Sequence, residues 1–405
     1  MNLSTSNARI FLAAGEASGD HYGAQLLAEL HSRHPSAIFF GLGGKEMEQF
    51  GLDRIVRAED VAHMGITEVI LHMPRIYGEY RRLIAAIKQR RPNIAILIDF
   101  PDVNLRLARE LRKLDIPVIY FVSPQLWAWK RKRLRWVQQR VSRMMVIFPF
   151  EEGFYRARGV NAAFVGHPLA QLSPPPSTRA EFAAKHQLDP AKNWIALLPG
   201  SRRKEIQLNL PEMLRAAVTL NKSADYEFIL PIASTVDESY LGTFLKDPQP
   251  KITLVNDARE ALQHARVSIV ASGTATVQAT IVGNPFIVVY RVSPVTFALA
   301  KRLIRYPSEI PHERDEQGNL PIAMVNLIAG RRIVPELLQT RFTAANIVTA
   351  LAPLLADSPA RSRMIADLAE AGLKLHPASG SSPIAQVCDA VETLLGQTPA
   401  ARGQI

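Results

Sequence analysis

The sequence lacks most features of secreted and membrane-spanning proteins. Its 405 residues include one cysteine, Cys388, which excludes an intrachain disulfide and any metal site built from several cysteines. No run approaches the ~20 apolar residues that a membrane-spanning helix needs. The apolar run Ile10–Ala14 is too short for a secretory signal. We therefore expect a cytoplasmic protein that is soluble or at most peripheral to a membrane.

Acidic residues are also in the minority. The chain has 48 Lys and Arg against 37 Asp and Glu, and this net charge of +11 favours acidic partners such as nucleotides, nucleic acid or an anionic membrane. The hydrophobic fraction of 47% is that of a globular protein. At this length one core is insufficient, so we expect two domains.

The stretch Trp194–Gln207 has the pattern of a strand, a tight turn and a helix start. The apolar run Ile195–Leu198 breaks at Pro199-Gly200, and a basic, helix-forming segment follows. Gly200 permits a sharp turn, Ser201 is a suitable N-cap, and free helix N–H groups would lie beside Arg202. The pattern fits an anion such as phosphate; an ordinary connection with solvated arginines is the alternative.

A second stretch, Val267–Pro285, repeats this pattern. A buried strand leads into Ser272-Gly273-Thr274 and then into a helix that ends at Val282, before Gly283. Two anion-binding turns at the carboxyl ends of strands in one α/β domain predict a diphosphate held between them.

A third turn, Ala14–Asp20, follows the expected strand Arg9–Ala14. Its glycines resemble a nucleotide-binding turn, but the spacing is not G-x-G-x-x-G. Glu16 and Asp20 also place negative charge where a phosphate would lie. A substrate hydroxyl is a better partner for these acids, and simple helix capping is the alternative.

The expected strand Ile94–Ile98 ends in a pair of aspartates. Asp99 lies at the carboxyl end of the strand, where α/β proteins keep their sites, and it fits a general base. Asp102 fits the cap of a helix that begins near Asn104. No further ligands accompany this pair, so the sequence gives no support for a metal site.

Two tryptophans, Trp127 and Trp129, precede the basic run Lys130–Arg135. This combination fits single-stranded nucleic acid, a sugar or lipid site, or a solvated helix face. No RNA-binding signature accompanies it, which disfavours nucleic acid.

An apolar stripe lies within Met64–Tyr77. Its members recur at spacings of three and four, which gives one apolar face on a helix: Ile66, Val69, Ile70, Met73 and Ile76. Pro74 would break or begin that helix. The stripe fits either a core-facing helix or a shallow membrane anchor flanked by basic residues.

Alternating strand and helix patterns predict an α/β fold of two doubly wound, Rossmann-like domains that face each other across a cleft. The other expected strands are Ile38–Gly41, Val118–Phe121, Glu227–Leu230, Ile252–Val255 and Phe286–Val289. We expect an N-terminal domain over 1–171, a proline-rich linker over 172–189, a C-terminal domain over 190–342, and helices over 343–405 that pack across both domains.

Nine motifs occur along the chain in an order that matches a known family. They are AGEASGDHYGAQL (Ala14–Leu26), MGITEV (Met64–Val69), IDFPDVN (Ile98–Asn104), SPQLWAW (Ser123–Trp129), FPFE (Phe148–Glu151), VGHP (Val165–Pro168), LPGSRRKEI (Leu198–Ile206), SGTAT (Ser272–Thr276) and VNLIAGR (Val325–Arg331). Together they resemble the lipid-A-disaccharide synthases over Arg9–Leu338. SGTAT is shared with other GT-B glycosyltransferases, whereas its combination with GEASGDHYG and SPQLWAW is specific.

The resemblance implies the GT-B fold and an inverting glycosyl transfer without a metal or other cofactor. The donor would be UDP-2,3-diacylglucosamine and the acceptor 2,3-diacylglucosamine 1-phosphate (lipid X). The products would be the β(1→6)-linked lipid A disaccharide 1-phosphate and UDP. Because acylated substrates do not readily leave a bilayer, we expect peripheral association with the cytoplasmic face of the inner membrane. A homodimer is compatible with the sequence, and no nucleic-acid partner is expected.

The resemblance also implies roles for individual residues. Asp99 matches the catalytic base. The expected acceptor-side residues are Gly15, Glu16, Ser18, Gly19, Asp20 and Trp127. The expected UDP-binding residues are Gly200, Ser201, Arg202, Glu205, Ser272, Gly273, Thr274, Ala275, Thr276, Gln278, Asn326 and Arg331. Gln278 departs from the family pattern, which has a glutamate that is expected to hold the ribose; the stretch before Asn326 is longer and more charged than that pattern.

Two alternatives come from other classes. A UDP-sugar 2-epimerase of GT-B fold would share the phosphate turns but would not need the Trp127–Trp129 stretch. A basic membrane- or RNA-binding protein without catalysis would have no reason to recognise UDP.

Overall fold

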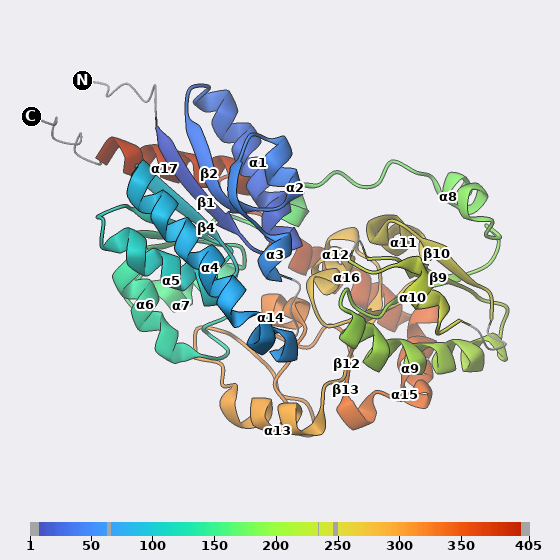
Figure 1. Cartoon of the computed structure of the whole chain (residues 1–405). Helices are drawn as coiled ribbons and strands as arrows, with labels where there is room; N and C mark the ends of the chain where they lie inside the picture. Colours follow the sequence, from blue (N-terminus) through green and yellow to red (C-terminus); the bar gives the residue numbers. More distant parts are fainter. Residues whose placement is uncertain (1–7, 63–65, 234, 246–249, 398–405) are drawn as a thin grey trace, which may run out of the picture. The chain divides into compact units, whose positions relative to one another are not determined.

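The structure, a computed structural model, describes residues 8–62, 66–233, 235–245 and 250–397, and the side chains of 61–73 lie outside this description. The chain divides into two compact units (Figure 1). Unit 1 comprises Met1–Pro168 and His376–Ile405, and unit 2 comprises Leu169–Leu375. The sequence prediction treated 343–405 as one segment, whereas the structure divides these residues between the two units.

Unit 1 is built on a seven-stranded parallel sheet with the order β3-β2-β1-β4-β5-β6-β7. Its strands are β1 (Arg9–Ala14), β2 (Ile38–Gly43), β3 (Asp53–Arg57), β4 (Ile94–Ile98), β5 (Val118–Phe121), β6 (Arg143–Val146) and β7 (Ala162–Phe164). The central strand β4 reads IAILI and is buried throughout, as expected for a parallel strand covered by helices on both faces.

Helices surround this sheet (Figure 1). They are α1 (Ala17–Arg33), α2 (Lys45–Gln49), α3 (Glu59–Ala62), α4 (Ile66–Arg90), α5 (Pro101–Arg112), α6 (Leu134–Arg140), α7 (Pro149–Arg156) and α17 (Pro383–Gln397). The last helix, α17, belongs to this unit because it packs on α1, where Arg33 Nη1 lies 2.7 Å from Asp389 Oδ1.

Unit 2 is built on a six-stranded parallel sheet with the order β10-β9-β8-β11-β12-β13. Its strands are β8 (Trp194–Leu198), β9 (Glu227–Pro231), β10 (Ile252–Val255), β11 (Val267–Ala271), β12 (Phe286–Tyr290) and β13 (Glu336–Leu338). Its helices are α8 (Arg179–His186), α9 (Arg203–Asn221), α10 (Glu238–Gly242), α11 (Ala258–His264), α12 (Thr274–Val282), α13 (Pro294–Leu303), α14 (Met324–Ala329), α15 (Ala344–Leu355) and α16 (Pro359–Leu373).

The predicted α/β class, the two doubly wound sheets and the helical C-terminal segment are confirmed. Each predicted strand is present with limits within two residues of those expected. Four strands were not predicted: β3, β6, β7 and β13. Each is five residues or shorter, and β3 (DRIVR) and β6 (RMMV) include arginines, so none has the apolar run of a central strand.

Two helix starts differ from the prediction. Helix α5 begins at Pro101 and not near Asn104, because proline is well suited to the first position of a helix. Helix α4 runs continuously through Pro74, so this proline neither breaks nor begins it.

Each sheet has one point where the strand order reverses. In unit 1 it lies between β1 and β4, and in unit 2 between β8 and β11. In doubly wound sheets, ligands bind outside the carboxyl ends of the strands that flank such a point. The turns after these four strands carry most of the predicted site residues.

Candidate functional site

In unit 1, the turns that follow β1 and β4 are neighbours because the two strands pair, with Ala14 opposite Ile98. Gly15 lies against the ring of Phe100: a Cβ added to Gly15 would come within 2.3 Å of a ring carbon. Only glycine therefore allows the two turns to meet in this way.

Asp99 and Phe100 both have left-handed backbone conformations, with φ of +46° and +47°. Non-glycine residues in this region typically cost of order 1–3 kcal/mol each and need support from their surroundings. Asn104 supplies it from inside α5. Its side-chain amide donates to the carbonyl oxygens of Ala13 (3.1 Å), Ile98 (3.1 Å) and Asp99 (2.8 Å).

Tyr120 adds a second support, since its hydroxyl donates to the Asp99 carbonyl oxygen over 2.6 Å. The Asp99 carboxylate is half-buried and influences several neighbouring groups. Burial raises the pKa of Tyr22 to about 12, and the negative charge of Asp99 adds to this rise. Tyr22 therefore remains a hydrogen-bond donor near Asp99 over the physiological pH range. The turn holds a carboxylate on a rigid backbone, which a general base requires.

Glu151, at the start of α7, is a second acid near Asp99 that the sequence analysis did not select. It is 1% exposed, and burial raises its pKa from 4.5 to about 7, with a smaller contribution from the charge of Asp99. Oε1 accepts hydrogen bonds from Ser123 Oγ (2.7 Å) and Trp127 Nε1 (3.1 Å). These partners are 24 or more residues away in sequence, so spacing alone gave no signal, although FPFE was among the family motifs.

Two predicted acceptor-side residues have structural roles. Asp20 is buried, and its carboxylate accepts the backbone N–H groups of Gly44 (2.7 Å), Glu46 (3.1 Å) and Met47 (3.2 Å), which caps α2. Trp127 is 1% exposed and packs edge-to-face on Phe150, so its ring offers no surface to an acceptor in this conformation.

The remaining acceptor-side residues lie at the start of α1. Glu16 is the N-cap residue and is half-buried, Ser18 is exposed, and Gly19 is buried below the turn. The structure therefore brings Gly15, Glu16 and Ser18 to the same edge of the sheet as Asp99.

In unit 2, the turn after β8 is closed by an acid from its own helix. Glu205 Oε2 accepts the N–H groups of Ser201 (3.1 Å) and Arg202 (3.3 Å), and Arg202 Nη1 lies 3.6 Å from Glu205 Oε1. Gly200 has φ +118°, and a Cβ there would meet Glu205 Oε2 at 2.5 Å. Ser201 was expected to be the N-cap, but Arg202 holds that position.

The turn thus binds a carboxylate with the N–H groups that were predicted to bind phosphate. This contact is the capping box of α9, and a diphosphate at the same N–H groups would have to displace or share Glu205. Asn209 fixes the turn from below by donating to the Pro199 carbonyl oxygen over 2.9 Å.

The turn after β11 lies beside it, because β8 and β11 pair with Leu198 opposite Val270. Gly273 is the N-cap residue of α12, Thr274 is exposed, and Ala275 is half-buried. Thr276 is buried and donates from Oγ1 to the Gly273 carbonyl oxygen over 2.8 Å. Gln278 is half-buried, one turn into the helix.

Asn326 and Arg331 are engaged with protein groups. Asn326 is fully buried; its amide donates to Glu336 Oε1 (2.8 Å), and its carbonyl oxygen accepts from Ile333 N (2.8 Å). Arg331 forms a two-pronged ion pair with Asp367 of α16, with distances of 2.9 and 3.2 Å. Asn326 is therefore not available to a ligand in this conformation, whereas the Arg331 side chain is 49% exposed beside its ion pair.

Of the predicted membrane stripe, the side chains of Ile66, Val69, Ile70 and Met73 lie outside the described residues, and Ile76 is half-buried. No helix in the described ranges combines the length and the apolar character needed to cross a membrane. Within the same ranges, no three or more His, Cys, Asp or Glu side chains are grouped so that they could hold a metal ion.

Comparisons with known proteins agree with the sequence motifs. The family model described as lipid-A-disaccharide synthetase matches residues 10–378. A lipid-A-disaccharide synthase of Acidobacterium capsulatum is 55% identical over 405 residues, covering 96% of this chain and 97% of that protein. Another, of Koribacter versatilis, is 46% identical over 375 residues, covering 92% and 94%.

Solved structures of low sequence identity share the fold. The calicheamicin glycosyltransferase CalG4 matches with a TM-score of 0.61 at 17% identity, covering 96% of this chain and 99% of that one. The UDP-GlcNAc 2-epimerase from Neisseria meningitidis, solved with UDP-GlcNAc, matches with a TM-score of 0.58 at 11% identity, covering 96% and 99%.

Proposed function

The chain belongs to the lipid-A-disaccharide synthase family, and from this premise we propose that it transfers diacylglucosamine from UDP to 2,3-diacylglucosamine 1-phosphate with inversion. It is a glycosyltransferase of GT-B fold. The predicted family, fold and enzyme class are thereby confirmed. The substrates, the residue roles and the membrane association described below are our proposals.

The observation that best supports the proposal is the placement of Asp99. It follows β4 at the reversal point of unit 1, on a backbone fixed by Asn104 and Tyr120. An inverting transfer needs a base that removes the proton of the acceptor hydroxyl as that oxygen attacks the anomeric carbon. A half-buried carboxylate on a rigid turn suits this task.

The leaving group is assigned to unit 2. Cleavage of the anomeric C–O bond places charge on the UDP oxygen, and backbone N–H groups at a helix start stabilise such charge where it develops. The turns after β8 and β11 offer these groups, and Arg202 adds a guanidinium whose side chain is 70% exposed. We propose that the diphosphate takes the place of the Glu205 carboxylate at the Ser201 and Arg202 N–H groups.

UDP binding provides a direct test of this assignment. UDP should raise the melting temperature in a concentration-dependent way, because a ligand that binds only the folded state stabilises it. No protection at millimolar UDP would contradict the assignment and favour a protein without a nucleotide site.

The epimerase alternative shares only the fold, since those structures are at most 12% identical to this chain, whereas the family match covers residues 10–378. Incubation with UDP-GlcNAc provides a check: an epimerase would form the 2-epimer, and we expect the sugar to remain unchanged.

We further propose that the protein binds the anionic cytoplasmic face of the inner membrane through α13. This ten-residue helix has no buried residue, and Val295 (79% exposed), Leu299 (56%) and Leu303 (63%) recur every four positions on one face. A helix this short is marginal in water unless something covers its apolar face. Lys301, Arg302 and Arg305 accompany the stripe, and residues 291–306 contain no acid, which favours anionic lipid as the cover.

The test replaces Val295, Leu299 and Leu303 together with serine and measures sedimentation with vesicles that contain phosphatidylglycerol. Lost binding with an unchanged melting temperature would support α13 as a membrane contact. Unchanged binding would contradict it, and a large fall in melting temperature would show that these side chains are covered by protein.

A further inference from the structure

Glu151, in the first turn of α7, contacts the loop that follows β5, here called the tryptophan loop (Ser123–Trp129). The Glu151 side chain is buried, with 1% of the residue exposed. Its Oε1 atom accepts hydrogen bonds from Ser123 Oγ at 2.7 Å and from Trp127 Nε1 at 3.1 Å. One buried carboxyl oxygen therefore ties both the beginning and the middle of the loop to α7.

Tyr155 adds a second connection between α7 and the tryptophan loop. It is fully buried, and its hydroxyl donates to the Pro124 carbonyl oxygen at 3.0 Å. The rings of Trp127 and Phe150 pack edge-to-face with 5.2 Å between their centroids. Residues of α7 therefore hold the loop by three buried hydrogen bonds and one aromatic contact.

The backbone immediately before the loop is strained. Val122 has φ +62°, and a β-branched residue rarely adopts this left-handed conformation. Such a conformation costs free energy and persists only where the surrounding structure fixes it. The contacts with α7 begin at the next residue, Ser123, so they supply part of this support.

The tryptophan loop lies next to the turn that carries Asp99, because β5 and β4 pair with Phe121 opposite Ile98. The Asp99 N–H donates to the Phe121 carbonyl oxygen at 2.9 Å, and the Tyr120 hydroxyl donates to the Asp99 carbonyl oxygen. Asp99 is also left-handed, so strained backbone lies at the ends of two neighbouring strands. The loop is thus connected to Asp99 through the end of β5.

The far end of the loop is held less firmly. Lys130 Nζ lies 3.8 Å from Asp102 Oδ1, and Arg133 pairs with the same carboxylate, whose side chain is 65% exposed. Exposed ion pairs contribute little to stability. The buried contacts with Glu151 and Tyr155 are therefore the main restraint on the loop.

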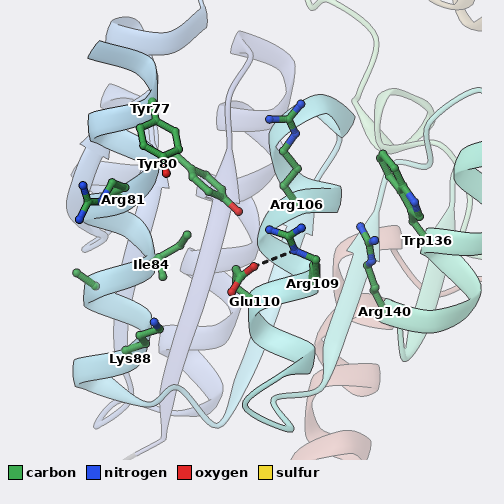
Figure 2. Close-up of a pocket in the computed structure, with 11 residues that line it drawn as sticks. Tyr77, Tyr80, Arg81, Ile84, Lys88, Arg106, Arg109, Glu110, Trp136 and Arg140 are labelled. Carbon is green, nitrogen blue, oxygen red and sulfur yellow. Dashed lines mark hydrogen bonds and ion pairs between the residues drawn. The ribbon is translucent and has the colours of Figure 1, made fainter. Parts of the chain in front are cut away.

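Glu151 differs in charge from another acid of this unit. In the groove between α4, α5 and α6, Glu110 pairs with Arg109, as Figure 2 shows. Burial alone would raise the pKa of Glu110, but hydrogen bonds from Lys113 and Arg109 hold that pKa below its usual value. Glu151 accepts from neutral donors instead, and burial raises its pKa to about 7. It therefore holds the loop while adding less negative charge near Asp99 than a fully ionised acid would.

We propose that Glu151 is a positioning residue for the sugar transfer: through Ser123 and Trp127 it fixes the tryptophan loop beside the Asp99 turn. Glu151 does not touch the reacting atoms and acts only through this loop. Displacement of a catalytic group by about 1 Å can cost on the order of 10²-fold in rate. The inference rests on the proposed function, because it concerns turnover in that reaction.

The test compares three single variants. Glu151→Ala removes the acceptor, whereas Glu151→Gln retains Oε1 and gives up only the longest contact, in which Oε2 accepts from Phe148 N at 3.3 Å. Glu152→Ala is the matched control, because Glu152 pairs with Arg156 at 2.7 Å on the surface. We expect kcat for disaccharide synthesis to fall about tenfold or more in Glu151→Ala and to stay within about threefold of the wild type in the other two. KM for the donor should not change, because its proposed site is in unit 2.

A double-mutant cycle tests whether Glu151 acts through the loop. Ser123→Ala alone should lower kcat, and adding it to Glu151→Ala should lower kcat by less than about twofold further, because the contact is already lost. Independent losses that multiply would overturn the proposed route. If Glu151→Ala does not fold, Ser123→Ala with Trp127→Phe removes both donors and retains the acid, and the same loss of kcat is expected.

Hydrogen exchange provides a readout that needs no substrate. Backbone amides of residues 123–129 should exchange faster in Glu151→Ala than in the wild type, and at the wild-type rate in Glu151→Gln and Glu152→Ala. Unchanged exchange in Glu151→Ala would overturn the inference. If the wild type forms the disaccharide and Glu151→Ala keeps its kcat, the inference fails while the proposed function stands. A wild type that forms no disaccharide would contradict the proposed function and, with it, the role of Glu151 in turnover.

Discussion

The side-chain amide of Asn104 donates to the carbonyl oxygen of Asp99 over 2.8 Å, and this contact fixes the backbone that carries the proposed base. Unit 2 has a counterpart, since Asn209 donates to the Pro199 carbonyl oxygen over 2.9 Å. Each asparagine lies on the helix that follows its turn and is fully or almost fully buried. In each unit, therefore, a buried asparagine on the following helix holds the turn through a side-chain hydrogen bond to a turn carbonyl oxygen.

Removing the unit 1 contact should affect both stability and turnover. Asn104→Ala removes an amide whose two N–H donors are shared among three carbonyl oxygens, and we expect the free energy of unfolding to fall by about 1–3 kcal/mol. Because Asp99 then loses its fixed position, kcat should fall in the variant that remains folded, while KM for the donor should change little. An unchanged kcat would show that the Asp99 turn needs no such support.

Asp99→Asn tests the base directly. We expect turnover to fall by about 10²–10⁴-fold, the usual contribution of a general base. UDP should still bind, because its proposed site lies in unit 2. The matched control is Asp102→Asn: Asp102 is 65% exposed at the side chain and pairs with Arg133, so this change should leave most activity. Near-normal turnover in Asp99→Asn would remove Asp99 from the mechanism.

Glu151 should give stability a pH dependence of definite sign. Its carboxyl has a folded-state pKa of about 7 against 4.5 when unfolded, so only the unfolded state loses this proton between these values. The protonated carboxyl contributes its full stabilisation below pH 4.5. This contribution declines as pH rises to about 7, and above pH 7 it is lost. Its total is on the order of 3 kcal/mol.

Glu151→Gln should therefore flatten the curve of unfolding free energy against pH between 4.5 and 7. The neighbouring Glu152→Gln, which breaks an exposed ion pair with Arg156, is the control and should leave the curve unchanged. Identical curves for the wild type and Glu151→Gln would show that the carboxyl is not held protonated.

Substitutions of Arg202 and Gln278 should affect binding of the diphosphate and of the uridine differently. Arg202→Ala should weaken UDP more than uridine, because the proposed partner of the guanidinium is the diphosphate. Gln278→Ala should weaken both alike through the ribose, and Gln278→Glu should bind equally or more tightly. These affinities can be measured by calorimetry. A marked loss of UDP affinity in Gln278→Glu would show that this site requires the neutral amide in place of the family's glutamate.

The sequence identified the turns more reliably than the side chains that act there. Gly200, Ser272 and Asp99 follow strands whose apolar runs are easily recognised, so their positions at the carboxyl ends of strands could be predicted, whereas the reversal points come from the strand order of the folded sheets. Glu205 closing its own turn and Asn326 binding Glu336 depend on tertiary contacts that spacing does not encode. Glu151 is a similar case, because only the folded core brings Ser123 and Trp127 to it.

The most direct test of the account is incubation of the protein with UDP-2,3-diacylglucosamine and 2,3-diacylglucosamine 1-phosphate, followed by mass analysis. We predict a disaccharide 1-phosphate that accumulates in step with UDP for the wild type, and its loss in Asp99→Asn. Release of UDP without any disaccharide, or no turnover of either substrate by the folded wild-type protein, would contradict the proposed function.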